Sequence, residues 1–159
     1  MSASSSASKG GRLITASSGS HGIGTAFAAR SLDKDLTVIW GIPASNSMAL
    51  ATSIHAGKVI ETEHLDTLAD AVAGGIDEDT ITLSLATSVV DEFIECDEDA
   101  IVHALKALAL EENMIVEGAA TLALAGFEKV KERVDVETSV ILLCGANYNQ
   151  ELILKAIYS

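Results

Sequence analysis

The chain is poor in aromatic and basic residues, and both shortages narrow what it can be. Phe, Trp and Tyr make up 4% of the 159 residues against 48% hydrophobic residues in all, so the core is expected to consist mostly of Ala, Leu, Ile and Val. Lys and Arg number 10 against 23 Asp and Glu, which gives a net charge of -13. This balance argues against nucleic acid and anionic membrane as partners, because phosphate binding needs clustered basic side chains.

Cysteine is also scarce, and long apolar runs are missing. Cys96 and Cys144 do not form a C-x-x-C pair, which argues against zinc and thioredoxin-type chemistry. No apolar run reaches the length of a membrane span. Residues 1–11 are rich in Ser and Ala and lack the apolar centre of a secretory signal. We therefore predict a disordered tail at 1–11, one domain at 12–159 and a cytoplasmic protein.

Short apolar runs alternate with segments of helical periodicity. The pattern predicts strands at 13–14, 37–42, 59–60, 93–96 and 139–143, and helices at 47–55, 65–72, 82–90, 100–110, 118–134 and 151–158. Asp97 stands where an N-cap belongs, and Ile101, Leu105 and Leu108 share one face of the helix that follows. The run 139–143 has the pattern of a buried strand. The alternation favours an α/β fold with a mostly parallel sheet flanked by helices.

Two polar, glycine-containing loops follow predicted strands, and such strand ends are where α/β sheets bind ligands. The first loop, at 17–22, comes before a predicted helix, where converging backbone N–H groups favour an anion. Its glycines do not follow the dinucleotide-binding order. The second loop covers 144–147. Taken alone, the first loop is better explained as a helix cap.

Four segments together carry a resemblance to a known family. They are 67–70 with Gly74 and Gly75 (resembling T-[IL]-A-D-G), 90–92 (V-D-D), 116–120 (V-E-[PG]-[AS]-[GA]-A) and 143–147 ([SC]-G-G-N). In this order and spacing they resemble the serine/threonine dehydratases, which are pyridoxal-phosphate (PLP) enzymes of fold type II, the tryptophan synthase beta-like group. The threonine dehydratase-like proteins of ectoine utilisation are the most similar subgroup.

The resemblance implies a fold, a cofactor and a reaction. The fold is part of the fold type II large domain, and the cofactor is pyridoxal 5'-phosphate. The family's reaction is a lyase reaction of amino-acid metabolism, β-elimination of water from a small 3-hydroxy amino acid to give a 2-oxo acid and ammonia. In the family, the residue at the position of Cys144 hydrogen-bonds the pyridine nitrogen, and Glu117 lies on the segment that approaches the ring. The resemblance also allows a homo-oligomer.

The first loop resembles two different family loops. In its residue types it resembles the family loop S-[SA]-G-N-H-[GA], which binds the substrate carboxylate, although Ser20 replaces the family's Asn. By its distance from the strand at 37–42 it corresponds to G-G-G-G-L, which cradles the PLP phosphate. Either correspondence implies that this loop contacts the cofactor or the substrate. The contacting residues would be Ser18, Gly19, Ser20, His21 and Gly22.

The main departure from the family is a missing lysine. No segment matches S-x-K-x-R-G, which carries the Schiff-base lysine, so no catalytic residue is assigned and impaired activity is expected. Ile42 replaces the family's acidic metal ligand, so no structural cation is predicted. The chain resembles a truncated or internally deleted large domain. The alternative function is a non-catalytic fragment that binds a full-length relative or itself.

Each candidate also has a purely structural interpretation. Cys144 would be an ordinary buried thiol, Glu117 a first-turn acid that favours the helix dipole, and His21 a turn residue. The other histidines, at 55, 64 and 103, are predicted on the surface, and the acidic cluster at 77–79 is predicted to be a solvated loop and cap.

Overall fold

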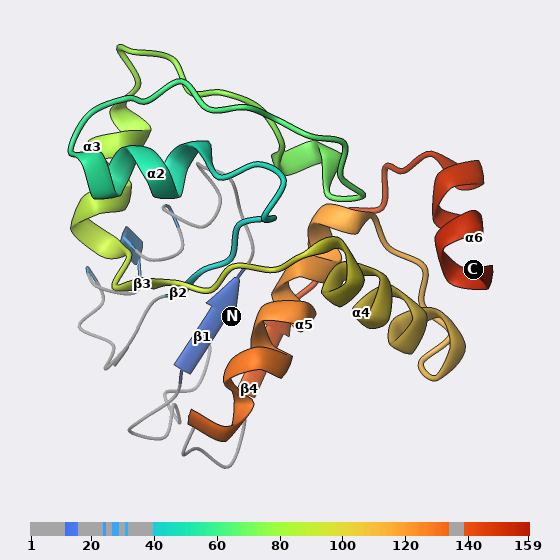
Figure 1. The fold of residues 1–159 in the computed structure, drawn as a ribbon. Coiled ribbons are helices and arrows are strands. Elements are labelled where there is room, and N and C mark those ends of the chain that lie inside the picture. The colour runs from blue at the N-terminus through green and yellow to red at the C-terminus, as the bar shows by residue number, and fades with distance from the viewer. Residues whose placement is uncertain (1–11, 16–23, 25–26, 29–30, 32–39, 134–138) are drawn as a thin grey trace, which may run out of the picture.

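The computed structural model describes residues 12–15, 24, 27–28, 31, 40–133 and 139–159 (Figure 1). Its strands are β1 (Arg12–Thr15), β2 (Trp40–Gly41), β3 (Glu92–Phe93) and β4 (Ser139–Leu142). Its helices are α2 (Ala49–Ala56), α3 (Ile81–Val89), α4 (Glu98–Leu110), α5 (Gly118–Val130) and α6 (Gln150–Tyr158), with 3-10 turns η1 (Asp70–Val72) and η2 (Lys131–Arg133).

All strand pairs in this part of the chain are parallel. β1 pairs with β4 from Arg12 opposite Ser139 to Thr15 opposite Leu142, and β2 pairs with β3. This arrangement confirms the predicted α/β class with parallel strands. It also means that β1 and β4, near opposite ends of the chain, finish at the same edge of their sheet.

Helix α5 is the central packing element. It contacts β1 and β4 on one side and α4 on another, while α6 packs on α4, and α2 and α3 form a separate pair (Figure 1). A Cβ added at Gly126 would lie 2.6 Å from Ile42 Cδ1, so the small residues of α5 do allow close approach. The largest fully buried side chains include Ile101, Leu105, Leu122 and Val130. The core is therefore aliphatic, as the low aromatic content predicts.

The start of α4 matches its prediction. The Asp97 side chain accepts a hydrogen bond from the Ala100 amide at 2.8 Å, which satisfies one of the free N–H groups of the first turn. Ile101, Leu105 and Leu108 are all buried. The cap and the apolar stripe thus both form where the sequence places them.

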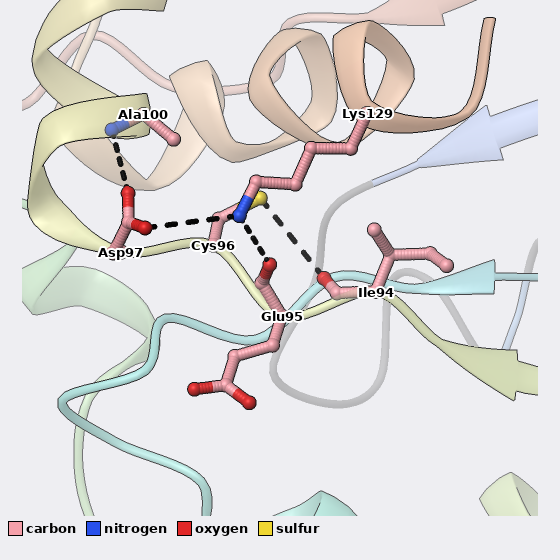
Figure 2. A network of polar contacts seen from close by, with 6 residues as sticks. All are labelled: Ile94, Glu95, Cys96, Asp97, Ala100 and Lys129. Atoms are coloured by element: carbon pink, nitrogen blue, oxygen red, sulfur yellow. Dashed lines mark hydrogen bonds and ion pairs between the residues drawn. The ribbon is translucent and has the colours of Figure 1, made fainter. Parts of the chain in front are cut away.

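The far end of α5 is tied to the chain between β3 and α4 (Figure 2). Lys129 Nζ donates to the main-chain oxygen of Glu95 at 2.8 Å and lies 3.9 Å from Asp97 Oδ2. Between these two acceptors lies Cys96, which is fully buried. Burial raises the pKa of the Cys96 thiol to about 11.

A second group of polar contacts joins β2, β3 and η2. Trp40 Nε1 donates to Glu92 Oε2 at 3.0 Å, and Arg133 donates to Glu92 Oε1 at 3.1 Å. The Arg133 guanidinium also lies over the Trp40 ring, 5.6 Å from its centroid. The hydrogen bond from Arg133 lowers the pKa of the Glu92 carboxyl group.

The strand predicted at 59–60 is wrong, because these residues are irregular. The Ile60 amide donates to Ser53 Oγ at 3.0 Å. Ser53 is fully buried on α2, so this bond satisfies its hydroxyl group and uses the amide that a strand would need.

The helix predicted at 65–72 is reduced to the 3-10 turn η1. Two amides just before it are taken by side chains. Leu68 N donates to Glu98 Oε2 at 2.9 Å, and Ala69 N donates to Thr67 Oγ1 at 3.1 Å. The segment is therefore held by α4 in an irregular conformation.

Three further expectations need correction. Helix α5 ends at Val130 and is followed by the 3-10 turn η2, while residue 134 lies outside the described residues. The strand at 139–143 is not buried along its described side chains, since Leu142 is 38% exposed. The acidic cluster at 77–79 is exposed as predicted, but the cap of α3 is Thr80, whose hydroxyl accepts from the Thr82 amide at 3.2 Å.

Candidate functional site

The candidate site lies where β1 and β4 end. Thr15 and Leu142 are opposite each other in the last register pair, and the two predicted ligand loops follow them directly in the sequence. The first loop lies outside the described residues, and with it the predicted contacts Ser18, Gly19, Ser20, His21 and Gly22. The structure does describe Glu117 and Cys144.

Glu117 is the N-cap residue of α5, but its side chain does not cap that helix. Instead, Glu117 Oε2 accepts a hydrogen bond from the Asn147 amide at 3.0 Å. The Glu117 amide donates to the Gly145 oxygen at 3.3 Å. We call this pair of bonds the loop link, because it joins the start of α5 to the loop after β4. Glu117 is 9% exposed, whereas Gly145 and Asn147 are exposed residues, so the link is partly buried.

The loop link depends on a glycine at position 145. Gly145 has a φ of 138°, which L side chains rarely adopt. A Cβ added there would lie 2.2 Å from Glu117 Oε1. The carboxylate therefore packs directly on the α-carbon of Gly145.

Cys144 precedes this glycine and is exposed. Its interpretation as an ordinary buried thiol is therefore wrong. The buried cysteine is Cys96.

The two thiols are expected to react very differently. At pH 8, Ellman's reagent should modify one thiol per native chain and two in urea, because Cys96 is buried and its raised pKa of about 11 keeps it protonated. Peptide mapping should place the native label on Cys144. Rapid labelling of Cys96 in the native protein would contradict the described burial.

Three of the four resemblance segments meet at this place. A Cβ on Gly118 would lie 1.9 Å from the main-chain oxygen of Leu68, so the segment 67–70 rests on the start of α5. The loop link brings the segment 143–147 to the same helix start. The fourth segment, 90–92, lies apart at β3.

A cavity of about 560 Å³ adjoins these segments. It lies between residues 65–73 and the start of α6, and its polar lining includes Thr67, Glu98, Tyr148 and Asn149. Glu98 Oε2 accepts from the Leu68 amide, while Glu98 Oε1 is buried with no hydrogen-bond partner among the described residues. No sequence motif singled out Glu98 or predicted this cavity.

The described histidines lie on the surface, as predicted. His55 stacks near Phe93 with ring centroids 5.8 Å apart, and His64 Nδ1 lies 2.9 Å from Ser47 Oγ. His103 is exposed on α4.

Within the described ranges, no group of three or more His, Cys, Asp or Glu side chains is arranged to hold a metal ion. No helix in that same part of the chain is both long and apolar enough to cross a membrane.

Comparisons with known proteins agree with one another. A family model described as "Pyridoxal-phosphate dependent enzyme" matches residues 33–145. The biosynthetic L-threonine dehydratase of Burkholderia multivorans is 30% identical over 128 residues, which are 79% of this chain and 25% of that protein. The catabolic L-threonine dehydratase of Escherichia coli K12 is 28% identical over 129 residues, 78% of this chain and 38% of that protein.

Solved structures share the fold. Maize serine racemase matches with a TM-score of 0.74 and 25% identity, over 92% of this chain and 46% of that chain. Threonine deaminase isoform 2 of Solanum lycopersicum matches with a TM-score of 0.79 and 22% identity, over 93% of this chain and 43% of that chain. The chain thus spans less than half the length of each of these relatives. It belongs to the pyridoxal-phosphate dependent enzymes, as a serine/threonine dehydratase-like member with the fold type II architecture.

Proposed function

We propose that this chain carries the pyridine-ring side of a PLP site and binds the cofactor without a covalent bond. In this proposal the chain alone does not catalyse the family's β-elimination. The observation that carries it is the loop link, which fixes the backbone beside the exposed Cys144 at the edge where β1 and β4 end.

The residues of this edge fit one side of the cofactor. PLP, when bound, supplies a ring that draws electrons from a substrate's α-carbon. Cys144 offers a thiol, a weak hydrogen-bond donor, just after a strand, which suits an unprotonated pyridine nitrogen. The segment 18–22 is the proposed partner for the anionic group of the cofactor or substrate.

The absence of the family's lysine motif supports a non-covalent mode of binding. The sequence contains no S-x-K-x-R-G segment. Lys129 lies at the opposite end of α5 from Glu117, about 18 Å along the axis at 1.5 Å per residue, and it donates to Glu95. A chain without a lysine at the cofactor lacks both the covalent anchor and the base that removes the α-proton.

The relatives named threonine dehydratase and serine racemase indicate the substrate class. We propose that a small 3-hydroxy amino acid is the substrate of any complete site to which this chain contributes. Such a site also needs a Schiff-base lysine, which no S-x-K-x-R-G segment of this sequence supplies.

PLP titration followed by borohydride reduction tests the proposal. We expect saturable, reversible binding of about one PLP per chain by equilibrium dialysis, and no reduced PLP on any single lysine by mass spectrometry. Cys144→Ala should weaken PLP binding roughly fivefold, since a lost hydrogen bond costs about 1 kcal/mol, while Cys144→Ser should retain the affinity. A stable adduct on one specific lysine, or no saturable binding, would overturn the proposal.

A second candidate function is non-catalytic association, with a full-length relative or a second copy. The observation that favours it is a set of exposed apolar side chains on α6, namely Leu152, Leu154 and Tyr158. Light scattering after size exclusion, with and without an intact threonine dehydratase, tests it. A monomer that fails to bind the relative contradicts it.

A further inference from the structure

We infer that Glu117 is a positioning residue, which fixes the Cys144 backbone through the loop link. The inference rests on the proposed function for its ligand, but the loop link itself can be tested without one. It gives Glu117 a specific role, where the family resemblance implies only that Glu117 lies on the segment that approaches the ring.

The orientation of the Glu117 carboxylate is the first argument. An acid at an N-cap ordinarily accepts from the second or third amide of its own helix. The Glu117 side chain makes no such bond and reaches the Asn147 amide, 30 residues away in the sequence. Its position on α5 is therefore used to hold another segment.

The whole carboxylate lies against the loop. Oε2 accepts a hydrogen bond from the Asn147 amide at 3.0 Å, and Oε1 lies 2.2 Å from the position that a Cβ of residue 145 would take. Hydrogen bonds to a carboxylate are stronger than neutral ones, and this one is partly buried. The side chain is therefore directed toward the loop after β4 and away from its own helix.

The backbone of Cys144 is held on both sides, by β4 before it and by the loop link after it. β4 is paired with β1 up to Leu142, and the Gly145 oxygen accepts from the Glu117 amide. Cys144 lies between these two fixed points and is nevertheless exposed. Its thiol therefore projects from a held backbone into a place that a ligand can reach.

Three variants separate the length of the side chain at position 117 from its charge. Glu117→Gln keeps the length and an acceptor oxygen but loses the charge. Glu117→Asp keeps the charge and the ability to cap a helix but is one methylene shorter, and Glu117→Ala removes both the length and the carboxylate. Glu112→Ala, at an exposed site, is the matched control. We expect hydrogen exchange of the Asn147 amide to rise at least tenfold in the Asp and Ala variants. It should stay within threefold of wild type in the Gln and control variants.

Two further readouts connect the loop link to the thiol and to PLP. The rate of Cys144 modification by Ellman's reagent should change at least threefold in Glu117→Asp and return toward wild type in Glu117→Gln. PLP affinity should fall at least threefold in the Asp variant and stay near wild type in the Gln variant.

The outcomes distinguish the two proposals. Unchanged Asn147 exchange in Glu117→Asp overturns the positioning role, whatever PLP does. A released Asn147 amide with unchanged PLP affinity also overturns that role and leaves the proposed function standing. If wild type does not bind PLP, the proposed function fails, while the exchange and thiol rates still decide whether Glu117 positions Cys144. If Glu117→Ala does not fold, the Asp and Gln variants carry the test.

Discussion

Gly145→Ala is expected to destabilise the protein by roughly 2–3 kcal/mol and to release the loop after β4. The first cause is the backbone, because Gly145 has a φ of 138°. Holding a residue with a side chain in such a sparsely populated region costs of order 1–3 kcal/mol. The second cause is the Glu117 carboxylate, which lies where the new Cβ would go. The carboxylate can swing away, but it then loses the Asn147 amide, at about 1 kcal/mol.

Urea unfolding followed by circular dichroism measures this loss. Gly75→Ala is the matched control, because Gly75 has no positive φ and the nearest atom to its added Cβ is His64 Nε2 at 3.9 Å. It should unfold within about 0.5 kcal/mol of wild type. A Gly145→Ala variant as stable as this control would contradict the described backbone.

The Gly145→Ala and Glu117→Ala changes should also be less than additive. Once the Glu117 carboxylate has been removed, the alanine at position 145 no longer clashes with it, so only the backbone strain still destabilises the protein. A double-mutant cycle that gives full additivity would show that residues 117 and 145 do not touch.

Leu122→Ala is expected to cost roughly 3 kcal/mol, within the range of about 2–5 for large-to-small changes in a core. Leu122 has no exposed surface and belongs to the main core, with Ile101 and Trp40. The loss combines the missing apolar burial with a cavity that the tightly packed α5 cannot close, since Gly126 already touches Ile42.

The same chemical change at the surface provides the control. Leu110 is 60% exposed at the end of α4, and Leu110→Ala should change the free energy of unfolding by less than about 0.5 kcal/mol. Equal effects of the two changes in urea titrations would contradict the position of the core.

Patterns over a few residues correctly predicted those helices whose position is set by contacts between residues close together in the sequence. The stripe of Ile101, Leu105 and Leu108 and the cap at Asp97 are separated by a few residues, so periodicity and cap chemistry suffice to place α4. Gly57 likewise ends α2 in the left-handed region, at a φ of 69°.

The segments 59–60 and 65–72, whose structure was predicted wrongly, have amides that bond to side chains and not to a strand or helix backbone. Ile60 bonds to Ser53, and Leu68 bonds to Glu98, which lies 30 residues further along the chain. An apolar pair such as 59–60 has the same sequence pattern whether its amides bond to a neighbouring strand or to a buried hydroxyl group. The sequence alone therefore could not exclude a strand there.

The candidate site was predictable only in part for the same reason. The family resemblance singled out Glu117 and Cys144, but each had to be interpreted separately. Their relation passes through the backbone of Gly145 and Asn147, which no residue-type pattern encodes. The exposure of Cys144 also differs from what its apolar neighbours in β4 suggest. The loop at 18–22 remains a sequence prediction.

The pairing of β1 with β4 has a consequence for how the protein is made. β1 begins at Arg12, and its partner in the register is Ser139, so the two strands are separated by most of the chain. During synthesis from the N-terminus, β1 has to wait for β4 while the more local helix pair α4 and α5 can already form. The β1–β4 pair that carries the candidate site can thus form only after β4 has been made, and until then β1 exposes the strand edge that β4 will cover.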